Sequence, residues 1–170
     1  MSKKSGFTLI ELLVTIAILG ILATVAVAVF NGVTARTRDS QRIKDLQSIK
    51  QALELYRGDQ HNYPKSSGTS SLVLSGSETL TNCTGIAGCT STTSAYLQPV
   101  PRDIDTSKNY YYLALPSSPA CDNNSSATTC TSFILCAKKE STSTTYDLSD
   151  CSSLSSCGSA GNCDIGISSQ

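Results

Sequence analysis

Several residue types that support catalysis or nucleic-acid binding are scarce in this sequence. Its 170 residues include no Trp, one His and one Met, and only 15% are charged. A single His leaves almost no side chain that titrates near neutral pH. Thirteen Lys and Arg balance thirteen Asp and Glu, so the chain has no excess of cations with which to neutralise phosphates. The composition therefore argues against a basic nucleic-acid binder and leaves little basis for acid–base catalysis.

The common catalytic motifs are also missing. There is no Ser-His-Asp spacing, no H-E-x-x-H sequence and no Gly-rich phosphate loop. The single histidine, His61, lies in a polar turn and is expected to be an exposed loop residue. We therefore expect a protein that is not an enzyme, with no cofactor and no small-molecule substrate. Whether it binds DNA is not predicted by the sequence.

A long uncharged run lies near the N-terminus. Residues 12–30 carry no charge, and as a helix they would span about 28 Å, close to the ~30 Å hydrocarbon thickness of a bilayer. Lys3 and Lys4 precede the run, which predicts a cytoplasmic N-terminus with the rest of the chain outside. The candidate residues of this membrane helix are Leu12, Leu13, Ile16, Ile18, Leu19, Gly20, Ile21 and Leu22.

Three interpretations of this run differ in how they treat Glu11. The first is a plain single-pass anchor. The second is a cleaved secretory signal with Ala26-Val27-Ala28 as its cleavage site, although its apolar core would exceed the usual length of roughly 7–15 residues. A carboxylate inside a membrane costs about 2.5–3.5 kcal/mol near the centre and less near the edge. The third interpretation offsets this cost, because a cation from another chain pairs with Glu11 at the same depth.

The sequence GFTLIE at residues 6–11, followed by an unbroken apolar run, resembles the class III signal of type IV pilins and pseudopilins. The resemblance implies that a prepilin peptidase cleaves after Gly6 and N-methylates Phe7. It also implies that Glu11 pairs with the N-terminal amine of a neighbouring subunit. Residues 1–6 would then be a cleaved leader, and residues 7–31 would be the membrane anchor that becomes the core of a helical filament.

The resemblance implies a structural subunit of a type IV pilus that serves adhesion, motility or DNA uptake. A pseudopilin of a type II secretion or competence machine is the second possibility. A monomeric, single-pass anchored, disulfide-rich binding domain is the alternative from another class. The implied partners are further copies of the chain, the inner membrane before assembly, prepilin peptidase, the pilus or secretion assembly platform, motor proteins and minor pilins. After assembly the filament would be extracellular or span the envelope.

Residues 32–58 are predicted to continue the helix as an amphipathic segment that ends at Gly58. An apolar stripe recurs at steps of three and four, and most of the charged residues between its members are expected to face solvent. Lys50/Glu54 and Arg42/Asp45 have the spacing of helical ion pairs. Unlike many family members, the chain has no proline before Pro64, so a bend or local melting would fall at Gly20 or Gly32; close packing explains Gly20 equally well. The stripe consists of Ile43, Leu46, Ile49, Leu53 and Tyr56.

Residues 59–170 are predicted to form a globular head. Residues 65–95 read as a long loop with room for a short helix or strand. Residues 109–115, 132–138 and 144–148 fit strands, the last two as a hairpin. The motif YLQPVP at 96–101 also resembles major pseudopilins. The expected fold class is α+β, similar to type IV pilins: a long N-terminal helix with a transmembrane first half, packed on a small antiparallel sheet with disulfide-rich loops.

All eight cysteines lie in this head, outside the cytoplasm on the predicted topology, where disulfides persist. The zinc spacing C-x2–4-C is absent, which disfavours a metal–thiolate site. We expect Cys83 to pair with Cys89 and at least one cysteine of the last three to bond back to the sheet. The eight candidates are Cys83, Cys89, Cys121, Cys130, Cys136, Cys151, Cys157 and Cys163.

Calcium needs separate attention because the resemblance to major pseudopilins implies a calcium site in the C-terminal loop. Calcium requires six to eight converging oxygens. No run in this sequence looks like the family's loop, and exposed turn acids explain the candidates better. We therefore expect no metal. The acidic residues available are Asp103, Asp105, Asp147, Asp150 and Asp164, of which Asp103, Asp105 and Asp150 are the weak candidates.

Overall fold

The computed structural model describes residues 6–66, 72–81, 94–117, 119–122, 128–141, 151 and 163–169. The chain divides into two compact units, Met1–Thr37 and Arg38–Gln170. Helix α1 (Leu9–Gln60) begins in the first unit and ends in the second, which we call the head unit. The predicted α+β class is confirmed, since the long N-terminal helix is combined with an antiparallel sheet and two disulfides in the head.

The first unit is an apolar helix whose side chains are exposed. Its large apolar residues range from 48% exposure at Val14 to 88% at Leu9. Within the part of the chain that the structure describes, α1 is the helix that is long and apolar enough to cross a membrane, judged by length and composition. It runs without interruption through Gly20 and Gly32, where an added Cβ would meet nothing within 4 Å. Such a surface must be covered by lipid or by other chains.

The remainder of α1 buries the predicted apolar stripe in the head unit. Leu46, Ile49, Leu53 and Tyr56 are at most 4% exposed, and Ile43 packs against them at the edge. The amphipathic prediction is therefore confirmed on this face. The stripe meets a core from the strands that includes Leu74, Tyr110, Tyr112, Phe133, Leu135 and Ile165.

The helix continues to Gln60, beyond the predicted end at Gly58. His61 adopts φ 62°, in the left-handed region, and its N–H donates to the Arg57 carbonyl oxygen at 2.8 Å. A left-handed residue after the last turn is the usual way to stop a helix. Here His61 occupies that position, and Gly58 lies inside the helix. The side chain of His61 is exposed, as predicted.

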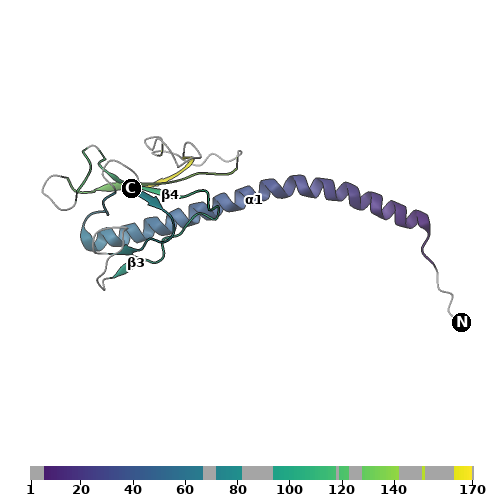
Figure 1. The fold of residues 1–170 in the computed structure, drawn as a ribbon, viewed down its shortest axis with the longest axis horizontal. Helices are drawn as coiled ribbons and strands as arrows, with labels where there is room; N and C mark the ends of the chain where they lie inside the picture. Colours follow the sequence, from purple (N-terminus) through teal and green to yellow (C-terminus); the bar gives the residue numbers. More distant parts are fainter. Residues whose placement is uncertain are drawn as a thin grey trace. The chain divides into compact units, whose positions relative to one another are not determined.

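The main sheet has four antiparallel strands in the order β1 (Leu72–Leu74), β4 (Tyr110–Leu115), β5 (Ser132–Ala137) and β6 (Ile165–Ser168). Figure 1 shows β4 beside the final turns of α1. β2 (Leu80–Thr81) and β3 (Ala95–Leu97) form a second small sheet. The strands predicted over 109–115 and 132–138 are confirmed as β4 and β5.

Two sequence predictions about the sheet were incomplete. The segment 65–95, predicted as a long loop with room for a short helix or strand, contributes the two short strands β1 and β2. The predicted strand 144–148 lies outside the described residues, and β6 takes the place beside β5, with Ala137 opposite Ile165 and Ile134 opposite Ser168. This partner is about thirty residues farther along the chain than the end of β5, so local patterning could not identify it.

Both faces of the central strands are buried, which explains why β4 and β5 show no polar alternation. Tyr110 and Tyr112 face the core that contains α1, whereas Tyr111 belongs to a second cluster. Cysteines supply half of that second cluster's buried members. An otherwise solvent-facing side of a small sheet is thus covered by cysteine-bearing segments. The cluster comprises Tyr111, Leu113, Ile134, Cys136, Cys151 and Cys163, with Leu115 at its edge.

Candidate functional site

The N-terminal end of α1 carries the predicted processing residues. Gly6 and Phe7 precede the helix, and the Phe7 side chain is 83% exposed. Glu11 lies in the first turn. Its Oε2 accepts hydrogen bonds from the Thr8 backbone N–H at 2.9 Å and from the Thr8 hydroxyl at 2.7 Å. The Glu11 N–H donates to Thr8 Oγ1 at 3.4 Å.

These reciprocal bonds form a capping box between Thr8 and Glu11. They satisfy amides that the first helical turn cannot pair internally and place a negative charge at the positive end of the helix dipole. Within one chain Glu11 therefore caps its own helix. The signal was present in the sequence as T-x-x-E before an apolar run, but reasoning centred on the membrane cost of the carboxylate missed it.

A second polar arrangement, which we call the ionic cluster, consists of Asp39, Arg42, Asp103, Lys108 and Glu140. The Arg42 guanidinium binds Asp103 through both carboxylate oxygens, at 2.7 Å from Nε and 2.9 Å from Nη2. It also donates to Asp39 at 2.8 Å and to Glu140 at 2.6 Å. Lys108 Nζ lies 2.9 Å from Glu140 Oε1. Arg42, Asp39 and Asp103 have no solvent-exposed side-chain area.

The electrostatics of the ionic cluster favour its charged form. Burial raises the pKa of the Asp39 carboxyl, but the Glu140 and Ser141 N–H groups outweigh it and hold this pKa below its ordinary value. For Glu140, burial is likewise outweighed by Arg42 and Lys108, so its pKa is also lowered. Burial lowers the pKa of the Arg42 guanidinium, but its bonds to Asp103, Glu140 and Asp39 outweigh burial and raise this pKa above its ordinary value. A buried guanidinium is tolerated when its charge and its donors are matched in this way.

This cluster corrects the predicted roles of several helix charges. Arg42 and Asp39 do not face solvent, and Arg42 pairs with Asp103, not with Asp45. Asp45 instead accepts from the Tyr110 hydroxyl at 2.7 Å, which together with burial raises the Tyr110 pKa. The expected Lys50/Glu54 pair is replaced as well. Lys50 Nζ donates to the Ser168 carbonyl at 2.9 Å, and Glu54 accepts from the Tyr63 hydroxyl at 3.0 Å.

The weak calcium candidates do not fit that ion. Asp103 is committed to Arg42, and its Oδ1 also accepts from the Asp105 N–H at 2.8 Å. Asp105 binds Lys108 at 2.9 Å and accepts from Ser107 at 2.7 Å, which lowers its pKa. Hydrogen-bond donors thus occupy the carboxylate oxygens with which Asp103 and Asp105 would bind calcium, and calcium needs six to eight oxygen ligands. Asp150 lies outside the described residues.

Among the described residues, two disulfides have both of their cysteines placed in the head unit. Cys136 of β5 bonds to Cys151. This confirms the prediction that at least one of the last three cysteines bonds back to the sheet. Cys121 bonds to Cys130. Cys163 is also disulfide-bonded. The predicted Cys83–Cys89 pair and Cys157 lie outside the described residues.

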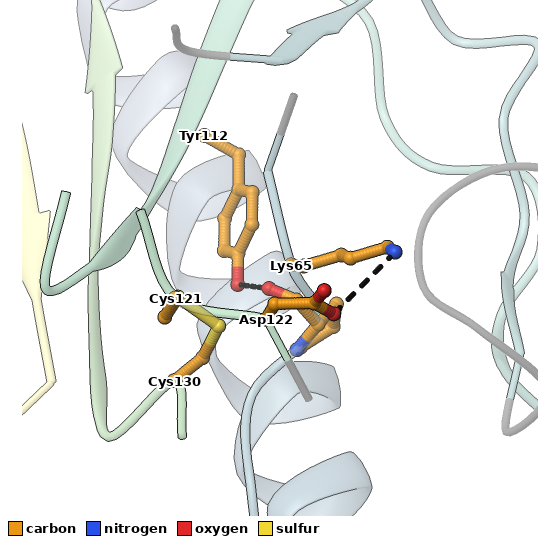
Figure 2. Close-up of a disulfide and its surroundings, with 6 residues drawn as sticks. Lys65, Tyr112, Cys121, Asp122 and Cys130 are labelled. Carbon is orange, nitrogen blue, oxygen red and sulfur yellow. Dashed lines mark hydrogen bonds and ion pairs between the residues drawn. A yellow bond between two sulfur atoms is a disulfide. The ribbon is translucent and has the colours of Figure 1, made fainter. Parts of the chain in front are cut away.

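The Cys121–Cys130 disulfide lies against the segment that follows the helix. Figure 2 shows the bond beside Tyr112, whose hydroxyl donates to the Pro64 carbonyl, and beside the Lys65–Asp122 ion pair. The Tyr63 N–H donates to the Cys130 carbonyl at 2.9 Å. Lys65 Nζ lies 3.8 Å from Asp122 Oδ1, and both side chains are roughly half exposed, so this ion pair contributes little stability. The disulfide and the hydrogen bond of the buried Tyr112 hydroxyl instead fix the segment that follows the helix.

Comparison with known proteins finds similarity to type II secretion and fimbrial proteins. The chain is 36% identical over 72 residues to the type II secretion system core protein G of Escherichia coli K12, covering 42% of this chain and 50% of that protein. It is 37% identical over 62 residues to the core protein G of Aeromonas hydrophila, covering 36% and 43%. It is 41% identical over 54 residues to a fimbrial protein of Pseudomonas aeruginosa, covering 32% and 35%.

The chain spans half or less of the length of these relatives. No solved structure matches it significantly. Residues 1–27 match the family model described as the prokaryotic N-terminal methylation motif. The resemblance inferred from residues 6–11 is therefore confirmed: residues 1–27 carry this motif, and part of the chain is similar in sequence to type II secretion and fimbrial proteins.

Proposed function

We propose that this chain is a structural subunit of a type IV pilus filament and that it has no enzymatic activity. The observation that carries the proposal is the apolar, exposed half of α1 with Glu11 in its first turn. An exposed apolar helix must be buried in lipid before assembly and among other helices afterwards. A carboxylate in that surface calls for a cation from a neighbouring chain.

Processing would supply the cation. Cleavage after Gly6 leaves the amine of Phe7 as the new N-terminus, one helical turn from Glu11. Methylation of that amine keeps its positive charge, so it can pair with the Glu11 carboxylate of an adjacent subunit. The match of residues 1–27 to the methylation motif supports this step. The apolar part of α1 would then pack in the core of the filament, and the head unit would be displayed on its surface.

The partners follow from this mode of assembly. The subunit would enter the inner membrane as a single-pass protein with its N-terminus in the cytoplasm and would be cleaved by prepilin peptidase. An assembly platform, motor proteins and minor pilins would then extend and retract the filament. Its work would be mechanical and adhesive, and it needs no small-molecule substrate.

A pseudopilin of a type II secretion machine is the second candidate. The names of the Escherichia coli and Aeromonas hydrophila relatives favour it. A pilus subunit predicts long filaments on the surface of the producing cell. A pseudopilin predicts that secreted enzymes accumulate in the periplasm when the gene is deleted. Imaging together with a secretion assay separates the two.

The mass of the mature chain and one pair of variants test the proposal. A start at methylated Phe7 is expected, whereas a start at Val29 would mean an ordinary signal peptide and retention of Met1 or Ser2 a plain anchor. Glu11→Gln keeps a residue that can complete the capping box but removes the charge. Thr8→Ala removes the hydroxyl half of the box and keeps the charge. We expect Glu11→Gln to be cleaved yet to form few or no filaments, and Thr8→Ala to assemble.

Either of two results would count against the pairing. Normal filament yield from Glu11→Gln would show that the carboxylate charge is dispensable. Equal loss of filaments in Glu11→Gln and in Thr8→Ala, which keeps the charge, would show that the carboxylate charge is not what decides assembly.

A further inference from the structure

We propose that the ionic cluster holds the loop before β4 and the segment after β5 against α1 without a metal ion. The fold of the head unit would then be independent of calcium. On the filament function proposed above, the assembled filament would then also tolerate calcium chelation. The contacts that the candidate residues make disagree with the calcium site that the family resemblance implies.

The ionic cluster joins three segments of the head unit that are distant in sequence. Asp39 and Arg42 lie on α1, Asp103 and Lys108 on the loop before β4, and Glu140 just after β5. Arg42 contacts residues 61 and 98 positions away, and Asp39 accepts N–H bonds from Glu140 and Ser141 at 2.8 Å each. Removing the centre of this arrangement would therefore release both loops from the helix.

The carboxylate oxygens of the ionic cluster are supplied with donors. Asp39 Oδ1 receives Arg42 and the Glu140 N–H, and its Oδ2 receives the Ser141 N–H. Both carboxylate oxygens of Asp103 accept hydrogen bonds from the Arg42 guanidinium. Glu140 Oε1 receives Arg42 and Lys108, and its Oε2 receives Arg38 at 3.3 Å. A calcium ion would have to displace these donors to gather its ligands.

Displacement would be unfavourable because the cluster's central cation is covalently attached. Arg42 has no exposed side-chain area, so losing its partners would leave a charged guanidinium buried and unpaired. Among the described residues, no group of three or more His, Cys, Asp or Glu side chains could hold a metal ion. Asp164 pairs with Lys138 at 2.8 Å. Asp147 and Asp150 lie outside those residues, so the test must include calcium itself.

The test is thermal unfolding of the full chain in detergent, followed by the near-ultraviolet circular dichroism of its tyrosines, all of which lie beyond residue 55. Midpoints are compared in excess CaCl2, excess MgCl2 and excess EGTA. An ion bound only by the folded state at a hundred times its Kd would raise the midpoint by about 10 °C. We expect the three midpoints to coincide.

Asp103→Asn tests whether the ionic cluster does the holding, with Asp105→Asn as its matched control. Both remove one carboxylate charge from the same loop, but Asp103 is buried against Arg42, whereas Asp105 binds the partly exposed Lys108 and Ser107. We expect Asp103→Asn to lower the midpoint equally with CaCl2 and with EGTA, and Asp105→Asn to lower it much less. If Asp103→Asn does not fold, Glu140→Gln, whose carboxylate is partly exposed, takes its place.

Three results would overturn the inference: a wild-type midpoint that falls in EGTA and recovers with CaCl2 but not MgCl2, equal effects of the two variants, or an Asp103→Asn effect confined to EGTA. Unfolding is measured on unassembled chains. A failure of the filament proposal would therefore leave this result unchanged, and a failure of this inference would not affect the processing and assembly tests.

Discussion

Gly166 has no room for a side chain, because a disulfide lies against it. It lies in β6, opposite Cys136 of β5, and a Cβ added there would come within 2.6 Å of Cys151 Sγ. That sulfur is bonded to Cys136, so it cannot rotate away as the end of a flexible side chain could. The glycine is thus required by the disulfide that crosses over its strand.

We predict that Gly166→Ala destabilises the head unit by about 1–3 kcal/mol, the usual cost of overpacking a close-packed site. Gly58→Ala is the matched control. Gly58 lies inside α1 with nothing within 4 Å of an added Cβ, so alanine there should stabilise the helix by about 0.5–1 kcal/mol. Urea unfolding of both variants measures the difference. Effects of the same sign would contradict this account of Gly166.

At the scale of elements, α1 is one helix in two environments. Its first part exposes apolar side chains along its length, whereas its last part has a buried stripe and an exposed face. Leu53 and Leu55 illustrate the second environment, since Leu53 is fully buried and Leu55 is 62% exposed. Both residues are leucines, so hydrophobicity alone cannot tell which is buried. The 3.6-residue helical period can, because it places them on different faces of α1.

We predict that Leu53→Ala destabilises the head unit by about 2–5 kcal/mol, because it leaves a cavity between the helix and the sheet. Leu55→Ala, the same substitution two positions along the helix, should change stability by less than about 0.5 kcal/mol. Chemical denaturation of the two variants in detergent provides the comparison. A similar loss in both would mean that Leu55 is also covered in the isolated chain.

For the whole molecule, buried ionisable groups set the pH range of stability. The pKa values of Asp39 and Glu140 are lowered in the folded state, so these carboxylates contribute stability above their ordinary pKa values. The tyrosines act in the opposite range. Burial raises the pKa values of both Tyr110 and Tyr112, so folding favours their protonated forms.

We predict that the urea midpoint is nearly constant between about pH 5 and pH 9. It should fall below about pH 4, as Asp39 and Glu140 protonate, and above about pH 10, where the unfolded chain ionises its tyrosines while the folded chain does not. A pH titration of urea unfolding, read by circular dichroism, checks both limbs. A midpoint that stays constant down to pH 2 would contradict the role given to the acidic residues.

How far the fold could be predicted depended on whether its cause was local. The apolar run, the stripe through Leu46 and Leu53 and the strands β4 and β5 follow from composition and period, and the structure confirms them. The helix end was displaced because the left-handed conformation of His61, and not the presence of Gly58, stops it. The partner strand β6 was missed because sheet pairing depends on contacts across the chain.

The candidate site divides in the same way. Gly6, Phe7 and Glu11 form a contiguous motif that the sequence alone identifies, and their processing and pairing remain proposals to be tested. The Thr8–Glu11 capping box was also readable, since its residues are three positions apart. Arg42 was not. Its helical position looks like one of several charged positions on the solvent face, because its partners Asp103 and Glu140 are 61 and 98 residues away.

The sequence by itself determined that a long apolar helix precedes a small cysteine-rich head, because helix period, apolar length and cysteine content are properties of short segments. Only the tertiary structure decided which charges are buried, which strand completes the sheet and that Cys136 bonds to Cys151. Those outcomes depend on which distant segments meet. In a head with a modest core, a buried guanidinium and two disulfides hold together contacts that no local pattern encodes.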